Sequence, residues 1–519
     1  MISPATLKSW IGDGRELAIL DAREEGEFGA GHLFWAVPCP LSQAPLRAPL
    51  LLPNRATRVV CVDGGGEHAA RLADVLRAMG CNDVHVLAGG TPAWGAAGHV
   101  VFSGVNVPSK AFGEWAEHHY HTESLDPPEL QALIDSGQDM VILDSRPMDE
   151  FHRMTIPGAI NVPGGELVYR IGDIAPDPGT TIVINCAGRT RSIMGAESLR
   201  RAGVPNRIVA LRNGTMDWEL AGFSCERGQS RSYAPGTPAS ADLALARAEG
   251  FASATRVKRL LPGALAAMQA DTTRTTYFLD VRAPEEYAAG HLPGFRHAPG
   301  GQLIQATDQW VATRHARIVL TDMGNTARAK MSAAWLRLMG GWEVHVLEGA
   351  SGPLETGAPA GPAVTPQHSV TVAELAAAQG GPGGAVVIDL ARSVDFRAGH
   401  ITGAIWGVRT RLPALPPEAS LVVVTAPNPA LAHLAVPELR GLTAAPVRVL
   451  EGGNAAWRAA GMPIAADRTI PADADCIDFH LRPYDRNAGV EAAMHAYLSW
   501  EIDLVHEVAR DGDARFGQL

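Results

Sequence analysis

Short apolar runs recur along the chain, and stretches with helical periodicity follow them. Four of these runs each lead into a polar loop, and they cover residues 58–62, 181–185, 317–321 and 421–425. Nearly continuous apolar runs of this length are typical of strands buried on both faces of a parallel sheet. Apolar positions at helical spacing come next, for example over residues 67–80 and 327–340. The pattern therefore predicts an α/β fold in which helices cover both faces of mainly parallel sheets.

A unit built on this pattern occurs four times. In each copy an earlier apolar strand ends in an aspartate, at spacings of 109 to 136 residues: Asp21, Asp144, Asp280 and Asp389. These spacings suit small domains and are too long for solenoid repeats. In three copies an arginine lies two positions further on: Arg23, Arg146 and Arg282. The fourth copy has Ala391 there instead.

The repeats, and the stretches rich in Pro, Gly and Ser between them, define the expected domain boundaries. We predict domains at residues 1–103, 125–226, 253–356 and 357–465, linkers at residues 104–124 and 227–252, and a C-terminal helical extension at residues 466–519. Within the extension, apolar residues recur at helical spacing over residues 489–512. This spacing predicts a helix docked on a neighbouring domain, and a partner-binding helix is the alternative.

Residues 182–192, IVINCAGRTRS, carry the strongest chemical signal in the chain. A strand that leads into Cys186 and turns directly into a helix aims backbone N–H groups and the positive helix end at the sulfur, which favours the reactive thiolate. Arg189 and Arg191 add positive charge for an anionic substrate. We predict Cys186 as the nucleophile, within a substrate-binding loop of Ala187, Gly188, Arg189, Thr190, Arg191 and Ser192. The alternative is a buried, idle cysteine.

The other three copies have no thiol at this position, where the aligned residues are Asp63, Asp322 and Ala426. Aspartate cannot hold sulfur through a reducible S–S bond, although it can accept the loop N–H groups as an internal anion. Alanine can do neither, so we predict that these three domains are inactive. Asp144 and Arg146 are expected to be structural residues near the site, because the same pair occurs in copies without a thiol.

Two segments together resemble the signatures of the rhodanese superfamily. The loop CAGRTR is similar to that family's active-site loop, and residues 141–163, VILDSRPMDEFHRMTIPGAINVP, resemble its second signature, Asp-x-Arg followed by Glu-Phe and Ile-Pro-Gly-Ala. The resemblance implies four tandem rhodanese-like domains, one of them active, and a sulfurtransferase that carries sulfane sulfur as a persulfide on Cys186. A cysteine phosphatase usually has one more residue between the cysteine and the arginine, so the short loop argues against phosphatase or arsenate reductase chemistry.

Composition narrows the expected partners and compartment. The chain of 519 residues is 46 % apolar and 19 % charged, and its net charge of −11 disfavours nonspecific binding to nucleic acid or to an anionic membrane. No apolar run approaches the ~20 residues of a membrane span, and the first residues lack the regions of a signal peptide. Six cysteines without a C-x-x-C pair argue against a disulfide framework or a zinc site. We therefore expect no metal, no cofactor and a reducing, cytoplasmic location.

The predicted reaction moves sulfane sulfur from thiosulfate or a related small anionic donor to a thiol, to cyanide or to a thioredoxin-like acceptor, in a ping-pong sequence. Arg189 and Arg191 are expected to hold the sulfonate oxygens and to stabilise departing sulfite. The alternative is a persulfide relay or partner-binding scaffold that turns over little free thiosulfate.

Overall fold

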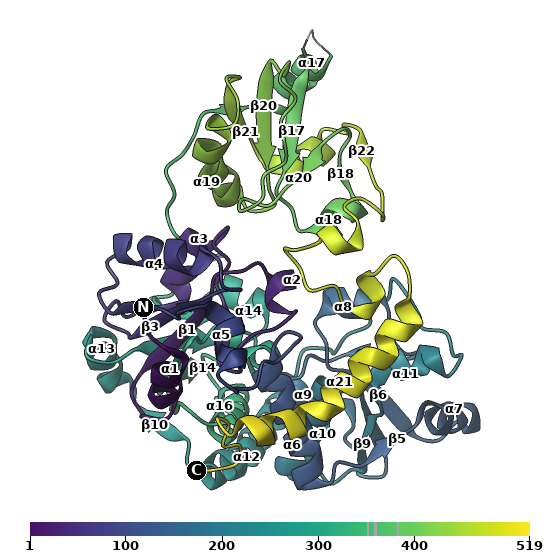
Figure 1. Ribbon diagram of the computed structural model, residues 1–519. Coiled ribbons are helices and arrows are strands. Elements are labelled where there is room, and N and C mark those ends of the chain that lie inside the picture. The colour runs from purple at the N-terminus through teal and green to yellow at the C-terminus, as the bar shows by residue number, and fades with distance from the viewer. Residues whose placement is uncertain (350–351, 358–360, 381–382) are drawn as a thin grey trace.

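The structure of the chain, a computed structural model, describes residues 1–349, 352–357, 361–380 and 383–519. It contains four α/β domains, each built on its own mainly parallel sheet with helices packed around it (Figure 1). Domains 1 to 3, numbered in chain order, pack together at the base of the view, and domain 4 stands above them. The predicted fold class is confirmed.

Domain 2 contains an all-parallel sheet of order β5-β9-β8-β6-β7. Its strands are β5 (Ser124–Leu125), β6 (Met140–Asp144), β7 (Ile160–Asn161), β8 (Thr181–Asn185) and β9 (Ile208–Leu211). Its helices are α7 (Pro127–Ser136), α8 (Met148–Arg153), α9 (Leu167–Ile174), α10 (Thr190–Arg201) and α11 (Gly214–Leu220).

Domains 1 and 3 repeat this plan, and domain 3 adds the short strand β13 to the domain 1 sheet, where it pairs antiparallel with β1. Domain 1 contains β1 (Leu17–Asp21), β2 (Ala36–Pro38), β3 (Val59–Val62), β4 (Val84–Val86), α1 (Pro4–Ile11), α2 (Glu25–Phe28), α3 (Ala44–Leu51), α4 (His68–Ala78) and α5 (Gly90–Ala96). Domain 3 contains β10 (Lys258–Leu260), β11 (Thr276–Asp280), β12 (Arg296–His297), β13 (Thr313–Arg314), β14 (Arg317–Thr321), β15 (Glu343–Leu347), α13 (Pro262–Ala270), α14 (Pro284–Ala289), α15 (Gly300–Gln305), the 3₁₀ helix η1 (Thr307–Gln309) and α16 (Ala327–Met339).

Domain 4 has a parallel sheet of order β16-β21-β20-β17-β19 and a small antiparallel pair, β18 with β22. Its strands are β16 (Ser369–Val370), β17 (Ala385–Asp389), β18 (His400–Ile401), β19 (Ile405–Trp406), β20 (Leu421–Thr425), β21 (Val447–Leu450) and β22 (Ile464–Ala465). Its helices are α17 (Val372–Gln379), α18 (Ser393–Ala398), α19 (Pro429–Arg440) and α20 (Gly453–Ala459).

The four strands predicted before the polar loops are confirmed as β3, β8, β14 and β20, and the two predicted helices are α4 and α16. The helix predicted over residues 489–512 is α21 (Val490–Asp511), which follows the 3₁₀ turns η2 (Asp473–Asp475) and η3 (Pro483–Asp485). As expected, α21 is docked on other parts of the chain, and it crosses the base of the molecule beside α6 and α10 in Figure 1.

The two segments expected to be linkers contain helices that the sequence analysis did not predict. These are α6 (Val107–Tyr120), between domains 1 and 2, and α12 (Pro238–Ala254), between domains 2 and 3. Helix α6 packs on α10 and α21, and α12 packs on α9 and α16. Both helices therefore belong to the packed body of the molecule.

One continuous apolar core joins domains 1, 2 and 3. It includes Trp94 of domain 1, Ile184 of domain 2 and Trp335 of domain 3, together with Phe112 of α6 and Leu504 of α21. Domain 4 has separate core clusters, around Val424 and around Trp457. The first three domains thus form one rigid frame to which domain 4 is added.

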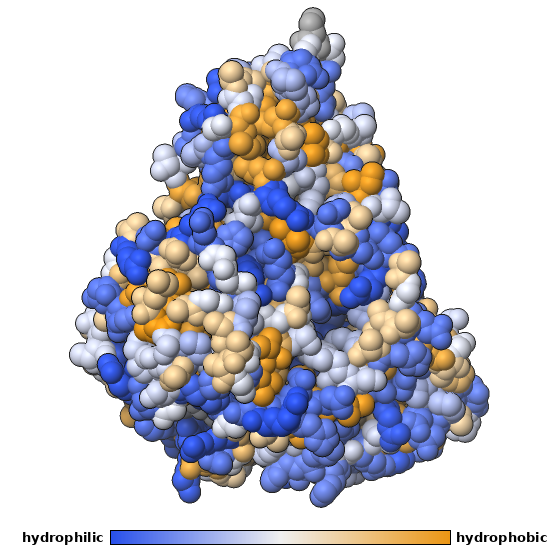
Figure 2. Space-filling view, viewed as in Figure 1, coloured by the Kyte–Doolittle hydropathy of each residue, from blue (hydrophilic) through white to orange (hydrophobic). Residues whose placement is uncertain are grey.

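Hydrophobic residues on the face shown in Figure 2 lie in separate patches among hydrophilic ones. Among the helices that the structure describes, none is both long and apolar enough to cross a lipid bilayer.

Candidate active site

Cys186 lies directly after β8 at the carboxyl edge of the domain 2 sheet, where the loop to α10 begins. Its side chain is only 2 % exposed, yet it lines a cavity of about 630 Å³. We call this the central cavity. Its walls come from all four domains, from α6 and from α21, and include Glu25, Lys110, Cys186, Gln305, Arg392 and Tyr497. The thiol is therefore shielded from bulk solvent but borders an internal space.

The loop that carries Cys186 is held by backbone hydrogen bonds from the start of α11. The carbonyl of Cys186 accepts from the N–H of Thr215 (2.9 Å), and that of Ala187 accepts from the N–H of Met216 (3.1 Å). Gly214 makes this approach possible, because its φ is +58° and a Cβ there would lie 2.2 Å from the Cys186 carbonyl oxygen. A glycine in the left-handed conformation thus fixes the position of the nucleophile.

Ser192 is the polar side chain recorded beside the sulfur. Its Oγ lies 3.6 Å from Cys186 Sγ and donates to the carbonyl of Arg189 at 2.8 Å. The hydroxyl therefore joins the thiol to the backbone at the far end of the same loop.

Arg191 forms a two-point ion pair with Glu150 on α8, at 2.9 Å and 2.7 Å. Burial opposes ionisation of Glu150, but the charge of Arg191 more than offsets it, so the pKa of Glu150 is lowered to about 2. Domain 3 has the same pairing between Arg328 and Glu286 although it lacks a thiol. The pair is therefore part of the fold as well as a source of positive charge near Cys186.

Arg189 turns away from an anion-binding position and toward α6. Its Nε and Nη2 donate to the two carboxylate oxygens of buried Glu114, both at 2.7 Å, Nη2 also pairs with Glu117, and Nη1 donates to Asn213 at 3.0 Å. Burial opposes the charge, but the hydrogen bonds to Glu114 keep the pKa of Arg189 above its ordinary value. In this structure Arg189 therefore anchors the loop to α6, and most of its N–H donors are taken by these contacts.

Helix α21 covers the middle of the loop. Thr190 Oγ1 donates to Glu501, whose side chain is buried. Gly188 lies against Tyr497, since a Cβ on that glycine would be 3.1 Å from Tyr497 Cε1. The expected ligand-binding residues Gly188 and Thr190 are thus in contact with the C-terminal helix.

Asp144 and Arg146 tie the preceding loop together, as expected for structural residues. Arg146 donates from Nε and Nη2 to the Asp144 carboxylate, at 2.9 Å and 2.6 Å, and from Nη2 to the carbonyl of Met154 at 2.5 Å. Domains 1 and 3 have the same arrangement, with Arg23 and Arg282 bound to the carbonyls of Gly31 and Gly290.

In domain 4 the role of this arginine is taken by an arginine from a helix elsewhere in the domain. There Arg458 of α20 donates to the carbonyl of Gly399, and Asp389 instead accepts from Asn454 at 2.7 Å. The carbonyl is therefore capped in all four domains, although the fourth has Ala391 in the arginine's position.

The aspartates of domains 1 and 3 accept N–H groups of their own loops. Asp63 accepts from Gly65 and Ala69 at 2.8 Å and 2.9 Å. Asp322 accepts from Thr326 and Arg328 at 2.6 Å and 3.1 Å. The prediction that these aspartates accept the N–H groups of their loops is confirmed. Burial raises the pKa of Asp322 above its ordinary value. In both loops, backbone N–H groups point at the carboxylate of the aspartate that directly follows the strand.

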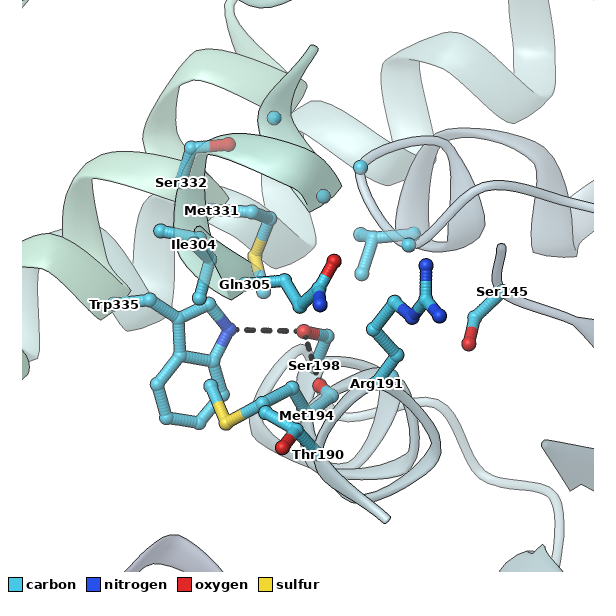
Figure 3. A pocket seen from close by; sticks show the side chains of 16 residues that line it. Ser145, Thr190, Arg191, Met194, Ser198, Ile304, Gln305, Met331, Ser332 and Trp335 are labelled. Atoms are coloured by element: carbon cyan, nitrogen blue, oxygen red, sulfur yellow. Dashed lines mark hydrogen bonds between the residues drawn. The ribbon is translucent and has the colours of Figure 1, made fainter. Parts of the chain in front are cut away.

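A second, much smaller space lies behind Arg191, where domain 2 packs on domain 3 (Figure 3). Its volume is about 40 Å³, and its wall includes a hydrogen bond of 2.9 Å from Trp335 Nε1 to Ser198 Oγ. Nearby, the backbones of Gly165 and Gly301 approach so closely that a Cβ on either would lie 2.8 Å from the other's nitrogen. This space is a packing feature of the domain interface and is too small for a substrate.

Sequence reasoning missed the residues outside the loop that complete the site. Glu150 belongs to the quoted Glu-Phe signature and could have been paired with an arginine of the loop. Glu114 and Lys110 lie in a segment expected to be a linker, and Tyr497 and Glu501 lie in the extension. These residues come close to Cys186 only because α6 and α21 pack against the loop. The local sequence does not show which surface each helix packs on.

Comparison with known proteins gives matches over the whole chain and over single domains. The family model for the rhodanese-like domain matches residues 3–97, 126–221 and 261–351. The crystal structure of a thiosulfate sulfurtransferase from Pseudomonas aeruginosa is 43 % identical, with a TM-score of 0.92, and the match covers 99 % of each chain.

Two curated proteins match over one domain only. The HTH-type transcriptional regulator Rv0324 of Mycobacterium tuberculosis is 34 % identical over 20 % of this chain and 46 % of its own length. The putative sulfur carrier protein YrkF of Bacillus subtilis is 29 % identical over 16 % of this chain and 44 % of its own length. The chain thus spans less than half the length of these two relatives.

Proposed function

This chain belongs to the rhodanese family and is a sulfurtransferase of the rhodanese type, and on that premise we propose that Cys186 carries the transferred sulfur. The donor is thiosulfate or a related small anion, and the acceptor is a thiol, cyanide or a thioredoxin-like protein. The substrate-binding groups are the backbone of residues 186–192 and the walls of the central cavity.

The observation that carries this proposal is the behaviour of the loops without a thiol. A carboxylate oxygen of aspartate and the outer sulfur of a cysteine persulfide both lie two bonds beyond Cβ. In domains 1 and 3 the loop amides donate to that oxygen. The equivalent loop of domain 2 offers the same kind of cradle to an anionic outer sulfur on Cys186.

In the first half-reaction, the Cys186 thiolate attacks the outer sulfur of thiosulfate. A new S–S bond forms, the bond between the outer and the central sulfur breaks, and its electron pair leaves with sulfite. The products are the anionic persulfide and a sulfite dianion, so the total charge is unchanged. Positive charge near the reacting atoms lowers the cost of bringing an anionic nucleophile to an anionic donor.

In the second half-reaction, the acceptor attacks the outer sulfur of the persulfide and the Cys186 thiolate leaves. With cyanide the product is thiocyanate, and with a thiol it is the acceptor's own persulfide. The enzyme alternates between two covalent forms, which predicts ping-pong kinetics. A reducing compartment such as the cytoplasm would keep Cys186 available, and all six cysteines are unpaired in the structure.

The test is the intact mass of the full chain after treatment with thiosulfate. We expect the native protein to gain one sulfur atom, Cys186→Ser to gain none, and cyanide to remove the added atom as thiocyanate. Cys225→Ser is the matched control in the same domain and should still gain the atom. Sulfur uptake by Cys186→Ser would overturn the assignment. Loading from a low-molecular-weight persulfide but not from thiosulfate would favour the relay over the thiosulfate-dependent enzyme.

A further inference from the structure

Lys110 on α6 is a buried lysine whose ammonium group lies in the wall of the central cavity. The residue is 6 % exposed. Its Nζ lies 4.9 Å from the centre of the Tyr497 ring and 4.5 Å from that of Trp500. Tyr497 in turn lies against Gly188 in the Cys186 loop. Lys110 and Cys186 therefore border the same cavity. The Tyr497 side chain of α21 contacts both the Cys186 loop and the Lys110 ammonium group.

Among the residues that the structure describes, no side-chain or backbone acceptor is recorded within hydrogen-bond or ion-pair distance of Lys110 Nζ. Lys330 is an instructive contrast, since it is equally buried but pairs with Glu249 at 2.7 Å and with Glu348 at 2.8 Å. An ammonium group in a largely buried side chain is poorly stabilised when no protein acceptor pairs with it. An anionic ligand in the central cavity would supply that acceptor.

The charged groups that face Lys110 come from several elements. They are Glu501 and Tyr497 of α21, Arg191 of the loop, His480 and Arg482 of the segment before α21, and Asp308 of η1. Burial raises the pKa of Asp308 to about 7, which reduces its negative charge near neutral pH. Glu501 accepts from Thr190. These carboxyl groups therefore do not replace a direct partner for the ammonium.

The two loop arginines are already occupied. Arg189 is held by Glu114 and Glu117, and Arg191 is held by Glu150. A dianionic donor that approaches the thiolate at Cys186 nevertheless needs a cation that is free to move onto it. Lys110 lines this cavity, and no carboxylate of the described residues is paired with it.

We propose that Lys110 binds the sulfonate group of the anionic donor and stabilises sulfite as it leaves, so that the anion site of the enzyme is supplied by α6. This inference rests on the proposed function of Cys186. It covers only the half-reaction in which the sulfur–sulfur bond of the donor breaks. An uncharged donor does not need the Lys110 ammonium. Comparing a charged with an uncharged donor therefore distinguishes a role in anion binding from a purely structural role.

The pH dependence adds a second readout. Burial is the main cause that lowers the pKa of Lys110 to about 8. Below that value the side chain is protonated and can bind an anion, and above it the charge is lost. We therefore expect kcat/KM for thiosulfate to fall as the pH rises through about 8. Lys110→Arg should move this fall to much higher pH, because a guanidinium stays protonated.

The experiment measures persulfide formation on the full chain with two donors, thiosulfate and uncharged dimethyl trisulfide. With the trisulfide, the thiolate attacks the central sulfur and displaces methanethiolate, which then removes the terminal methylthio group as dimethyl disulfide and leaves the persulfide anion on Cys186. For Lys110→Met we expect kcat/KM for thiosulfate to fall about 100-fold, at the lower end of the range found when one donor to a developing anion is removed. The value for dimethyl trisulfide should change less than about twofold, and Lys110→Arg should recover much of the activity with thiosulfate. Lys258→Met removes an exposed lysine of domain 3 and is the matched control, expected to leave both donors unaffected.

Three results would overturn the role of Lys110. An equal loss with both donors that Lys110→Arg fails to restore would indicate a structural role. Unchanged kinetics with thiosulfate in Lys110→Met would place the anion site elsewhere while leaving the proposed function intact. Absence of persulfide in the native protein with either donor would refute the proposed function itself, and the role of Lys110 with it.

Discussion

Arg189 and Arg191 follow Cys186 so closely that an anion-binding role is the natural prediction for both, and their partners show why proximity along the chain does not decide it. A guanidinium has five N–H donors in a planar fork, and a carboxylate facing that fork takes two of them. Arg189 meets Glu114 in this way and contacts Glu117 and Asn213 as well. The positive charge of Arg189, which could otherwise bind an anionic substrate, is thus paired with carboxylates that hold α6 against the loop.

Substitution of Arg189 is therefore expected to damage stability more than recognition of the donor. In Arg189→Met the buried carboxylate of Glu114 loses its partner, and breaking a buried ion pair in this way costs about 3–5 kcal/mol. We expect a clear drop in the thermal midpoint of the full chain, measured by calorimetry, with little change in KM for thiosulfate in the fraction that stays folded.

The double variant Arg189→Met with Glu114→Gln provides the control. Removing the stranded charge should recover part of the lost stability, because most of the cost lies in the unpaired carboxylate. A large rise in KM for thiosulfate in Arg189→Met, at unchanged stability, would contradict this assignment and return Arg189 to the substrate.

At the scale of single elements, the strands and the helices with clear periodicity, α21 among them, could be predicted, whereas helix α6, which also completes the site, could not. Strands β8 and β14 are buried on both faces, and their apolar runs show this directly. Helix α6 has no such stripe, because it is buried against several elements at once, with Lys110 and Glu114 among its buried positions. Its sequence was therefore expected to be a linker, and the partners of Arg189 and the position of Lys110 were missed for the same reason.

The turn into α11 gives a sharp test of how the loop is positioned. Gly214 and Gly203 both have positive φ, +58° and +70°, but a Cβ on Gly214 would meet the Cys186 carbonyl at 2.2 Å, whereas a Cβ on Gly203 would meet nothing within 4 Å. Alanine at either position pays the same conformational cost, about 1 kcal/mol. Only alanine at position 214 also pushes on the backbone that carries the nucleophile.

We therefore expect Gly203→Ala to lower the free energy of unfolding by about 1 kcal/mol while persulfide formation stays normal. Gly214→Ala should be less stable than that and should form persulfide at least about tenfold more slowly, since small displacements of a nucleophile are costly. Both variants are compared by urea denaturation and by rapid-quench mass analysis. Equal behaviour of the two would show that the contact at Cys186 has no part in positioning the thiol.

On the scale of the whole molecule, the domains without a thiol are walls of one site. Domain 3 contributes Gln305 and domain 4 contributes Arg392 to the central cavity, whose floor carries Cys186. An outer hollow of about 450 Å³ shares Arg392, Phe479 and Arg482 with that cavity. These three residues thus form a boundary that the two spaces share, between domains 2 and 4.

The charged residues at this boundary lead to a prediction about how the donor reaches the central cavity. Arg392 and Arg482 flank the Phe479 ring, at 5.4 Å and 5.9 Å from its centre, and their side chains are 58 % and 53 % exposed. Arg392 pairs with Asp395 at 2.8 Å, and Arg482 lies 3.6 Å from Glu150. Both guanidinium groups still face solvent, where they can attract an anion that the net charge of −11 otherwise repels. Such cations act on the rate of encounter more than on the chemical step.

We expect Arg392→Gln combined with Arg482→Gln to lower kcat/KM for thiosulfate severalfold at low salt while kcat at saturating thiosulfate stays near its native value. The difference from the native protein should shrink as the ionic strength rises toward 1 M, because screening then acts over about 3 Å. Arg440→Gln removes an exposed arginine of domain 4 outside the cavity and is the matched control. Its kinetics should follow the native protein at every salt concentration. If the double variant keeps native kcat/KM at low salt, thiosulfate enters the central cavity by a route that these arginines do not influence.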